Sequence, residues 1–410
     1  MTRITLKEAR RLFLYSQGLW PQPARRFRTV LEAIGALAGV QYDPNPVISQ
    51  SHYMVLWNRV PGFCEADLDQ AAYSEYTVLE GTFLNKNLFY VPAAEFHVYN
   101  QATRSISRWG RSRAEVEELA AVSPESWRAV EQVADCLGRF GPLTRNQIFE
   151  RLDWQEGYRR VADLARVGTP IPVHEWICTP VGALRLLMWS GEVLIAGRIP
   201  GRFREPLFAL RTALPLAVRL GPVPDEQEAH AELVRRLVHA YGITRPRHLA
   251  RLTGYKVAEV QRLMKEQAAR YGDLIPVTVQ ETGREIYWVV ASVLEAVQTA
   301  AASFSGPQAS LLTPLDNAVR DRTFLEALFG YTFEMEYFQK KGMRWQLSVL
   351  IDDEFRGFVD CKADRPRGRL LVRELSPADP NCDWIPLLQR RLMELCHYHG
   401  CSEVVLPGER

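Results

Sequence analysis

Hydrophobic positions in the first sixty residues fall into short runs with helical spacing, separated by glycines and prolines. The first run is ARRLFLYSQGL. Thr5 precedes it as a candidate N-cap, with Glu8 three residues further on, and Gly18 ends it. The later runs end near Gly39 and before the turn Pro61-Gly62. These patterns predict helices over about residues 9–19, 27–37 and 48–57.

Residues 120–210 show three helical runs followed by two strand-like segments. Thr144 can cap the second helix, Gly191 follows the third, and Pro200-Gly201 makes a tight turn between the strands. Helix, helix, helix and β-hairpin is the order of a winged helix. The predicted helices cover residues 127–140, 144–152 and 183–190, and the hairpin covers 192–208.

Residues 225–292 repeat that order more clearly. An amphipathic helix comes first, a second helix is capped by Thr244, and two strands flank Thr282-Gly283. Helix-turn-helix variants of this kind commonly place one helix in a DNA groove, although winged helices also serve as protein-contact or scaffold modules. The helices cover residues 226–242, 244–254 and 255–271, and the strands lie within 274–290.

The chain beyond Leu311 reads as a series of strands, after a helix and linker over 293–310. We expect an antiparallel sheet with one helix. Its strands cover residues 333–338, 344–351, 356–364, 370–375 and 403–406, and its helix covers 387–399. The fold class is therefore α+β, with tandem winged-helix modules, three in number, and a C-terminal β-rich domain. The expected domains are 1–120 (winged-helix-like), 121–222 and 223–305 (winged helices) and 306–410 (β-rich).

Composition places the chain among ordinary globular proteins. Its 410 residues suffice for two to four domains at roughly 100–200 residues each. Hydrophobic residues at 47% and charged residues at 24% exclude a disordered or fibrous chain. Seven cysteines without framework spacing argue against a disulfide scaffold. The N-terminus lacks the apolar region of a signal peptide, and no run of about 18 apolar residues suggests a membrane span, so we expect a cytoplasmic protein.

A net charge of +2 by itself argues against a nucleic-acid partner. Arginines nevertheless gather at the edges of the predicted modules, where their guanidinium groups suit bidentate phosphate contacts. A solvated face with ion pairs is the alternative for each cluster. The candidate DNA-binding residues are Arg108, Arg111, Arg198, Arg202 and Arg204.

Motifs for nucleotide or metal chemistry are missing from the sequence. It contains no P-loop, no G-x-G-x-x-G after a strand and no nucleophile elbow. The run CHYHGC, residues 396–401, lacks the ligand spacing of a zinc finger, and Cys361 and Cys382 are distant from it in sequence. We therefore expect neither a metal nor a cofactor.

The triplet Gln41-Tyr42-Asp43 is the strongest candidate for local chemistry. Pro44 favours an extended backbone at Asp43, and in an extended segment Gln41 and Asp43 share one side. An amide and a carboxylate side by side can hold and polarise one water molecule. The alternative is an ordinary turn, because Asp before Pro is a common turn element.

Three longer stretches belong together: EARRLFLYSQGL, then VQYDPNPVISQSHYMVLWNR, then LLTPLDNAVRDRTFLEALFGYTFEMEYF with VDCKADR after it. In that order they resemble the Arg-rich first helix, the Gln-hydrophobic-Asp motif with its following helix, and the C-terminal signature of the bacterial winged-helix DNA glycosylases of the YcaQ/AlkZ type. That family removes alkylated purines and unhooks interstrand crosslinks. The chain departs from the family where Ser49-Gln50 replaces Glu-Arg, and where Thr77-Val78-Leu79-Glu80 lacks a histidine.

The resemblance implies a monofunctional DNA glycosylase that acts on cationic, N7-alkylguanine-type purines in double-stranded DNA without a cofactor. It makes Asp43 the base and the stabiliser of an oxocarbenium-like sugar, and Gln41 the residue that positions water. Physical chemistry agrees, because a cationic purine leaves with little acid help and the enzyme must mainly stabilise the sugar cation. This assignment requires both side chains to face one open basic channel.

Two other functions stay open at this point. A non-catalytic winged-helix regulator would bind DNA in a salt-dependent manner and release no base. A scaffold whose modules bind protein would have no DNA affinity at low salt. For the glycosylase we expect a monomer in the bacterial cytoplasm, associated with the nucleoid through DNA.

Overall fold

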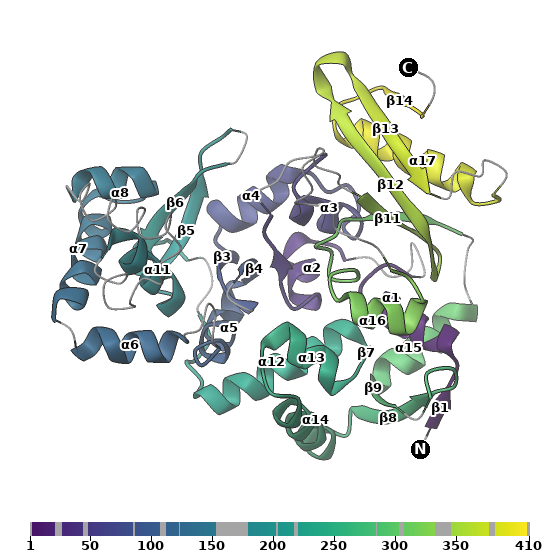
Figure 1. Cartoon of the computed structure of the whole chain (residues 1–410), viewed down its shortest axis with the longest axis horizontal. Coiled ribbons are helices and arrows are strands. Elements are labelled where there is room, and N and C mark those ends of the chain that lie inside the picture. The colour runs from purple at the N-terminus through teal and green to yellow at the C-terminus, as the bar shows by residue number, and fades with distance from the viewer. Residues whose placement is uncertain are drawn as a thin grey trace, which may run out of the picture. The chain divides into compact units, whose positions relative to one another are not determined.

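The computed structural model of the chain, shown in Figure 1, divides into two compact units. Unit 1 consists of residues 1–68, 234–251 and 256–410, and unit 2 of residues 69–233 and 252–255. The division into four domains stays a prediction. No described helix is long and apolar enough to cross a membrane. The structure describes residues 2–20, 27–43, 48–84, 87–106, 112–122, 124–152, 179–201, 204–216, 220–283, 285–302, 307–332, 346–376 and 382–407.

The first helices of unit 1 begin where side chains cap them. The predicted cap of the first helix is confirmed, because Thr5 accepts a hydrogen bond from the Glu8 amide and the Glu8 carboxylate accepts one from the Thr5 amide at 2.7 Å. The second helix begins later than predicted because Thr29 caps it. These elements are α1 (Leu6–Ser16), α2 (Val30–Ala36), β2 (Val40–Gln41) and α3 (Ser51–Trp57).

The element order predicted for residues 225–292 is present. Thr244, however, does not cap a helix. It lies in a short strand and its hydroxyl contacts His248 Nδ1 at 2.7 Å, while the helix begins at Pro246. The elements are α12 (Glu226–Tyr241), β7 (Ile243–Thr244), α13 (Pro246–Thr253), α14 (Val257–Tyr271), β8 (Leu274–Val279), β9 (Ile286–Val290) and α15 (Ala291–Ala302).

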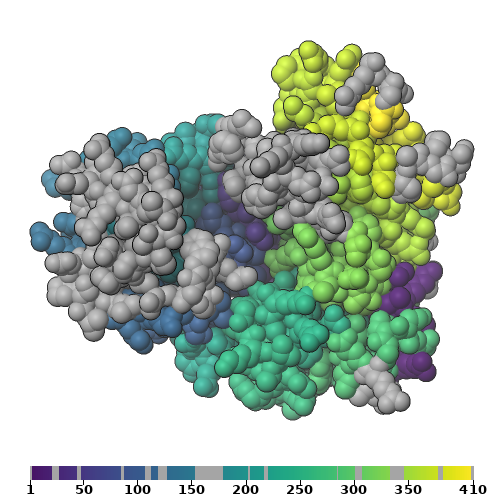
Figure 2. All heavy atoms as spheres, in the orientation of Figure 1, coloured from purple at the N-terminus to yellow at the C-terminus, as the bar shows by residue number. Residues whose placement is uncertain are grey.

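The N-terminal strand β1 (Thr2–Ile4) joins the sheet of this module. It pairs in parallel with β8, with Ile4 opposite Val279, and the strand order is β1-β8-β9-β7. The first and third predicted domains therefore share a sheet within unit 1. Figure 2 shows the atoms of residues 230–290, in green, at the bottom of the view.

The C-terminal sheet has the order β10-β11-β12-β13-β14. The expectation of a purely antiparallel sheet is wrong, because β14 pairs in parallel with β13. A parallel return needs a crossover, and α17 supplies it between these two strands. The predicted strand 333–338 and residues 344–345 lie outside the described residues. The elements are β10 (Ala309–Leu312), α16 (Arg322–Phe329), β11 (Gln346–Ile351), β12 (Glu354–Asp364), β13 (Arg369–Ser376), α17 (Ile385–Tyr398) and β14 (Glu403–Val405).

The core beneath this sheet joins it to the N-terminal part of unit 1. Leu388 and Leu392 of α17 pack with Val349 and Val359 of the strands, and Met54 of α3 enters the same cluster. The cysteines of the CHYHGC run, Cys396 and Cys401, are buried there as well. Burial of apolar side chains thus connects α3 to the sheet.

Unit 2 contains a sheet with the antiparallel order β4-β3-β5-β6 and a helical core around α7 and α11. The predicted Thr144 cap is confirmed, with Gln147 completing a capping box. Gly191 ends α11 with φ of 75°. The elements are α4 (Glu65–Tyr73), which begins in unit 1, β3 (Val78–Thr82), β4 (Leu88–Pro92), α5 (Phe96–Ala102), α6 (Arg113–Val122), α7 (Pro124–Phe140), α8 (Arg145–Arg151), α11 (Pro180–Ser190), β5 (Val193–Arg198) and β6 (Pro206–Leu210).

Candidate active site

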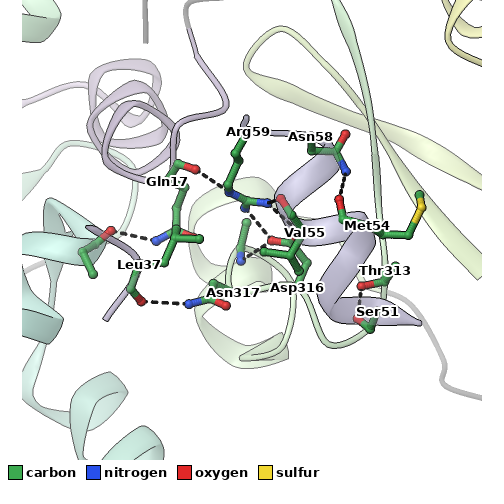
Figure 3. Close-up of polar contacts among 12 residues, drawn as sticks. Gln17, Leu37, Ser51, Met54, Val55, Asn58, Arg59, Thr313, Asp316 and Asn317 are labelled. Carbon is green, nitrogen blue, oxygen red and sulfur yellow. Dashed lines mark hydrogen bonds and ion pairs between the residues drawn. The ribbon is translucent and has the colours of Figure 1, made fainter. Parts of the chain in front are cut away.

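A sharp turn between α2 and β2 leads into the triplet Gln41-Tyr42-Asp43. Ala38 and Gly39 both have positive φ, 52° and 99°. The side-chain amide of Asn317 donates a hydrogen bond to the Leu37 carbonyl oxygen at 2.9 Å (Figure 3). It donates a second one to the Gly39 carbonyl oxygen at 3.1 Å. One buried amide group therefore satisfies backbone acceptors on both sides of Ala38, directly before the strand that carries Gln41.

The stretch that contains Asn317 is fastened by a buried ion pair between Arg59 and Asp316. Arg59 Nη1 and Nη2 donate to the two Asp316 oxygens at 2.8 and 2.7 Å, and both side chains are 0% exposed. Arg59 Nε also donates to the Gln17 carbonyl at 2.7 Å, and Nη1 to the Val55 carbonyl at 2.9 Å (Figure 3). A desolvated pair is tolerated when its remaining donors are satisfied in this way.

Helix α3 is tied to the same stretch at both ends. The hydroxyl groups of Ser51 and Thr313 form a hydrogen bond, and Asn58 Nδ2 donates to the Leu311 carbonyl at 2.8 Å. Figure 3 shows the Ser51 and Thr313 side chains meeting at the beginning of α3. The LLTPLDNAVRDR segment recognised in the sequence thus contacts both the turn before the Gln-Tyr-Asp triplet and helix α3.

The requirement that both catalytic candidates face an open channel is not met at Asp43 in this structure. Gln41 is half-buried, whereas Asp43 is only 3% exposed. The Asp43 amide donates to His52 Nδ1 at 3.3 Å, and the His52 ring stacks on Tyr42 at 4.9 Å between centroids. Of the two catalytic candidates, only Gln41 has appreciable solvent exposure in this state. The catalytic roles of Gln41 and Asp43 stay predictions.

The second C-terminal segment, VDCKADR, contacts the chain at Ile48, where the described residues resume after the triplet. Arg365 Nη2 donates to the Ile48 carbonyl at 2.9 Å and lies 3.2 Å from His399 Nδ1. Burial, reinforced by the charge of Arg365, lowers the pKa of His399 to about 4, so its ring is neutral near pH 7. Ser49 Oγ donates to Glu65 at 3.2 Å, and burial raises the pKa of that carboxyl group.

Arg198 and Arg204, predicted to bind DNA, form ion pairs within unit 2. The Arg198 side chain is 2% exposed and pairs with the buried Glu80 carboxylate, with Nε 2.9 Å from Oε2. Burial lowers the pKa of Arg198, but the pairing with Glu80 outweighs it and raises the pKa above its usual value. Arg204 donates to both oxygens of Asp69 at 3.1 and 2.6 Å. Contact with DNA stays a prediction for both residues, and for Arg198 it requires that the guanidinium leave Glu80. The other candidates, Arg108, Arg111 and Arg202, lie outside the described residues.

Several residues that shape this region were not among the predicted site residues. Arg59 and Asp316 are 257 positions apart, and Asn317 is 280 positions from Leu37, so no local pattern joins them. One signal was available: Asp316 and Asn317 are adjacent strongly polar residues within the mainly apolar run LLTPLDNAV. Buried polar residues need partners, which marks such positions as members of a network. His52 carries a weaker signal, since only its place in the stretch VQYDPNPVISQSHYMVLWNR distinguishes it.

Comparison with known proteins gives two findings. A family model described as DNA glycosylase AlkZ-like matches residues 34–394. The solved structure of Streptomyces sahachiroi DNA glycosylase AlkZ is similar, with a TM-score of 0.66 and 16% sequence identity over 99% of this chain and 99% of that chain. At this identity the structural likeness shows a shared fold. The range matched by the family model includes the triplet and both C-terminal segments that surround it.

Proposed function

Because the chain belongs to the AlkZ-like DNA glycosylase family, we propose that it hydrolyses the N-glycosidic bond of cationic alkylated purines in double-stranded DNA. The substrates are of the N7-alkylguanine type. The observation that carries the proposal is the placement of the Gln41-Tyr42-Asp43 backbone, held by Asn317 before the triplet and by His52 at Asp43. A backbone held on both sides of these two polar side chains favours the defined placement that a positioned water and a developing cation require.

The purine leaving group needs little acid catalysis. Alkylation at N7 places a positive charge on the purine, so the electron pair of the C1′–N9 bond moves to N9 and neutralises the ring as that bond breaks. The sugar becomes oxocarbenium-like, and the Asp43 carboxylate stabilises it. Gln41 orients a water molecule that adds to C1′, and Asp43 accepts the proton lost by that water. The products are the free alkylpurine and an abasic site.

The low exposure of Asp43 adds a requirement to this mechanism. With 3% of the residue exposed, water and sugar reach the carboxylate only after DNA binding uncovers it. A carboxylate with little solvent around it acts on a nearby cation through a lower effective dielectric constant, and so more strongly than one in bulk water. We therefore propose that lesion binding opens the triplet before the bond breaks.

The same chemistry extends to nitrogen-mustard interstrand crosslinks, since each crosslinked base is an N7-alkylguanine. We propose that the chain unhooks them, acts as a monomer and needs no cofactor. Its place is the bacterial cytoplasm, where its DNA substrate lies.

The test uses a duplex with a single N7-methylguanine, followed by alkaline cleavage of abasic sites. We expect the wild-type chain to release the base and Asp43→Asn to be slower by about 10²–10⁴-fold, the usual worth of acid–base catalysis. Asp353→Asn is the matched control, because Asp353 is also buried in unit 1, where it pairs with Arg11 at 2.7 Å. The control should retain the wild-type rate.

Two results would contradict the proposal. Equal rates for Asp43→Asn and wild type would remove the catalytic role of Asp43. Salt-dependent binding to the lesion duplex without any base release would instead favour the regulator. A crosslinked duplex assayed in parallel tests unhooking separately.

A further inference from the structure

The turn before the triplet contains one residue, Ala38, in a conformation that residues with a side chain do not favour. Ala38 has a φ of 52°, in the left-handed region where residues with a Cβ atom are uncommon, and it is fully buried. Helices commonly end with glycine at such a position. Here Gly39 follows it with a φ of 99°, so two consecutive positive φ angles reverse the chain between α2 and β2. The amides of Ala38 and Gly39 donate to the α2 carbonyls of Gly35 and Ile34 at 3.1 and 2.9 Å, which closes the helix end. Contacts from outside the segment add to these local bonds.

Asn317 is the residue placed to hold it. Its amide nitrogen carries two hydrogens and donates to the Leu37 and Gly39 carbonyls at 2.9 and 3.1 Å, so one group spans Ala38. Asn317 is 1% exposed. It cannot swing away easily, because its neighbour Asp316 is paired with Arg59 and accepts a further hydrogen bond from the Ala318 amide at 2.9 Å.

The position of this contact in the chain matters for the reaction. Gly39 is two residues before Gln41, about 7 Å at the rise of an extended strand. Movement of the turn therefore displaces the Gln41 side chain almost directly. A misplacement of about 1 Å in a catalytic geometry can cost about 10²-fold in rate.

We propose that Asn317 is a positioning residue for base excision: its amide fixes the turn Leu37–Gly39 and thereby sets where Gln41 and Asp43 stand. The inference rests on the proposed function and assigns a mechanical role to the C-terminal LLTPLDNAVRDR segment. Asn317 acts through the backbone of the turn and makes no contact with the substrate.

The chain contains a matched control for the loss of a buried amide. Gln17 is also in unit 1, is fully buried, and its side-chain amide donates to the Ala240 carbonyl at 2.7 Å. Asn317→Leu and Gln17→Leu each remove the hydrogen bonds of one buried amide and leave an apolar group of similar size. Only Asn317→Leu frees the turn before the triplet.

The experiment measures single-turnover base release from an N7-methylguanine duplex at saturating enzyme, together with the Kd for that duplex and the Tm of each variant. For Asn317→Leu we expect a rate about 30–100-fold below wild type with a Kd within threefold. For Gln17→Leu we expect the wild-type rate, even if its Tm falls as far as that of Asn317→Leu. Equal rate losses in both variants, or none in Asn317→Leu, would overturn the proposal.

Ala38→Gly separates positioning from relief of strain. Glycine adopts the left-handed conformation readily, so Ala38→Gly removes the strain at this position. If Asn317 served only to offset that strain, the double variant Ala38→Gly/Asn317→Leu would recover the wild-type rate. A positioning role predicts that the double variant stays as slow as Asn317→Leu, because glycine leaves the turn freer to move.

Hydrogen exchange keeps this inference distinct from the proposed function. We expect faster amide exchange over residues 37–43 in Asn317→Leu but not in Gln17→Leu. Unchanged exchange in both variants overturns the positioning role, whether or not the wild-type chain is active. If the wild-type chain releases no base while exchange in Asn317→Leu rises as expected, the proposed function and the catalytic part of this inference are both wrong. The conclusion that Asn317 fixes the turn Leu37–Gly39 then still holds.

Discussion

The buried pair of Arg59 and Asp316 allows a sharp test of what holds unit 1 together. Both side chains are 0% exposed, and Arg59 makes four hydrogen bonds, two to the carboxylate and two to backbone carbonyls. Arg59→Met leaves a buried carboxylate without its charge partner, and Asp316→Leu leaves a buried guanidinium. Each loss of one partner in such a pair costs about 3–5 kcal/mol.

Removing both charges together should cost far less than the sum of the single losses. Independent effects would add to about 6–10 kcal/mol. In Arg59→Met/Asp316→Leu no buried charge is left, and the remaining cost is the loss of partners for the two carbonyl groups and the Ala318 amide, about 3–5 kcal/mol in all. The coupling free energy between the two sites is therefore about 3–5 kcal/mol.

Urea unfolding followed by circular dichroism measures the cycle, with equal m-values as the check that all four proteins unfold in the same way. Additive single effects, or single losses below about 1 kcal/mol, would refute the view that desolvated charge dominates this pair. Asp316→Asn is a milder variant that keeps the shape of the side chain. It should lower the free energy of unfolding by less than Asp316→Leu does.

Three further outcomes are expected. Burial lowers the pKa of His248 to about 3 and that of His399 to about 4, so the unfolded chain takes up protons first, and stability that is complete above pH 6.5 falls as the pH drops towards these values. At pH 5 each histidine lowers the free energy of unfolding by roughly 2 kcal/mol. Thermal melts should show that the Tm of His248→Phe depends less on pH than the Tm of wild type. An identical pH dependence would contradict a destabilising protonation of His248. His52→Phe keeps a stacking ring but removes the acceptor for the Asp43 amide, so base release should slow by about tenfold at similar Tm; an unchanged rate would mean that His52 only fills space. Arg198→Met leaves a buried carboxylate unpaired and should destabilise unit 2 by about 3–5 kcal/mol, seen as faster limited proteolysis there, and wild-type protease resistance would contradict it.

Local signals explain the elements that were predicted correctly. The capping boxes at Thr5 and Thr144 and the glycine stop at Gly191 act within a few residues, so the sequence alone reports them. Thr244 shows the limit of the same reasoning. It has the right residue type for a cap, but pairing with β9 takes it into a strand, and its hydroxyl bonds His248 instead.

Strand β3 was not predicted because its pattern does not alternate between apolar and polar residues. Every residue of β3 is buried, so the alternation that identifies a half-exposed strand is missing. The same strand carries Glu80, whose buried carboxylate is paired with Arg198, 118 positions later, and accepts a hydrogen bond from Tyr73. A charged residue is ordinarily expected at the surface, and only the tertiary partner reverses that expectation.

The sequence by itself determined the fold class, the family and the positions of the Gln41-Tyr42-Asp43 triplet and the C-terminal signature, because these rest on residue identity and short-range spacing. Only the tertiary structure decided that the signature holds the triplet. The hydrogen bonds of Asn317 to a turn 280 positions away follow from how the chain packs, since a buried amide must find its acceptors wherever the fold brings them. The tertiary structure likewise decided the burial of Asp43, which the proposed catalytic role requires DNA binding to relieve.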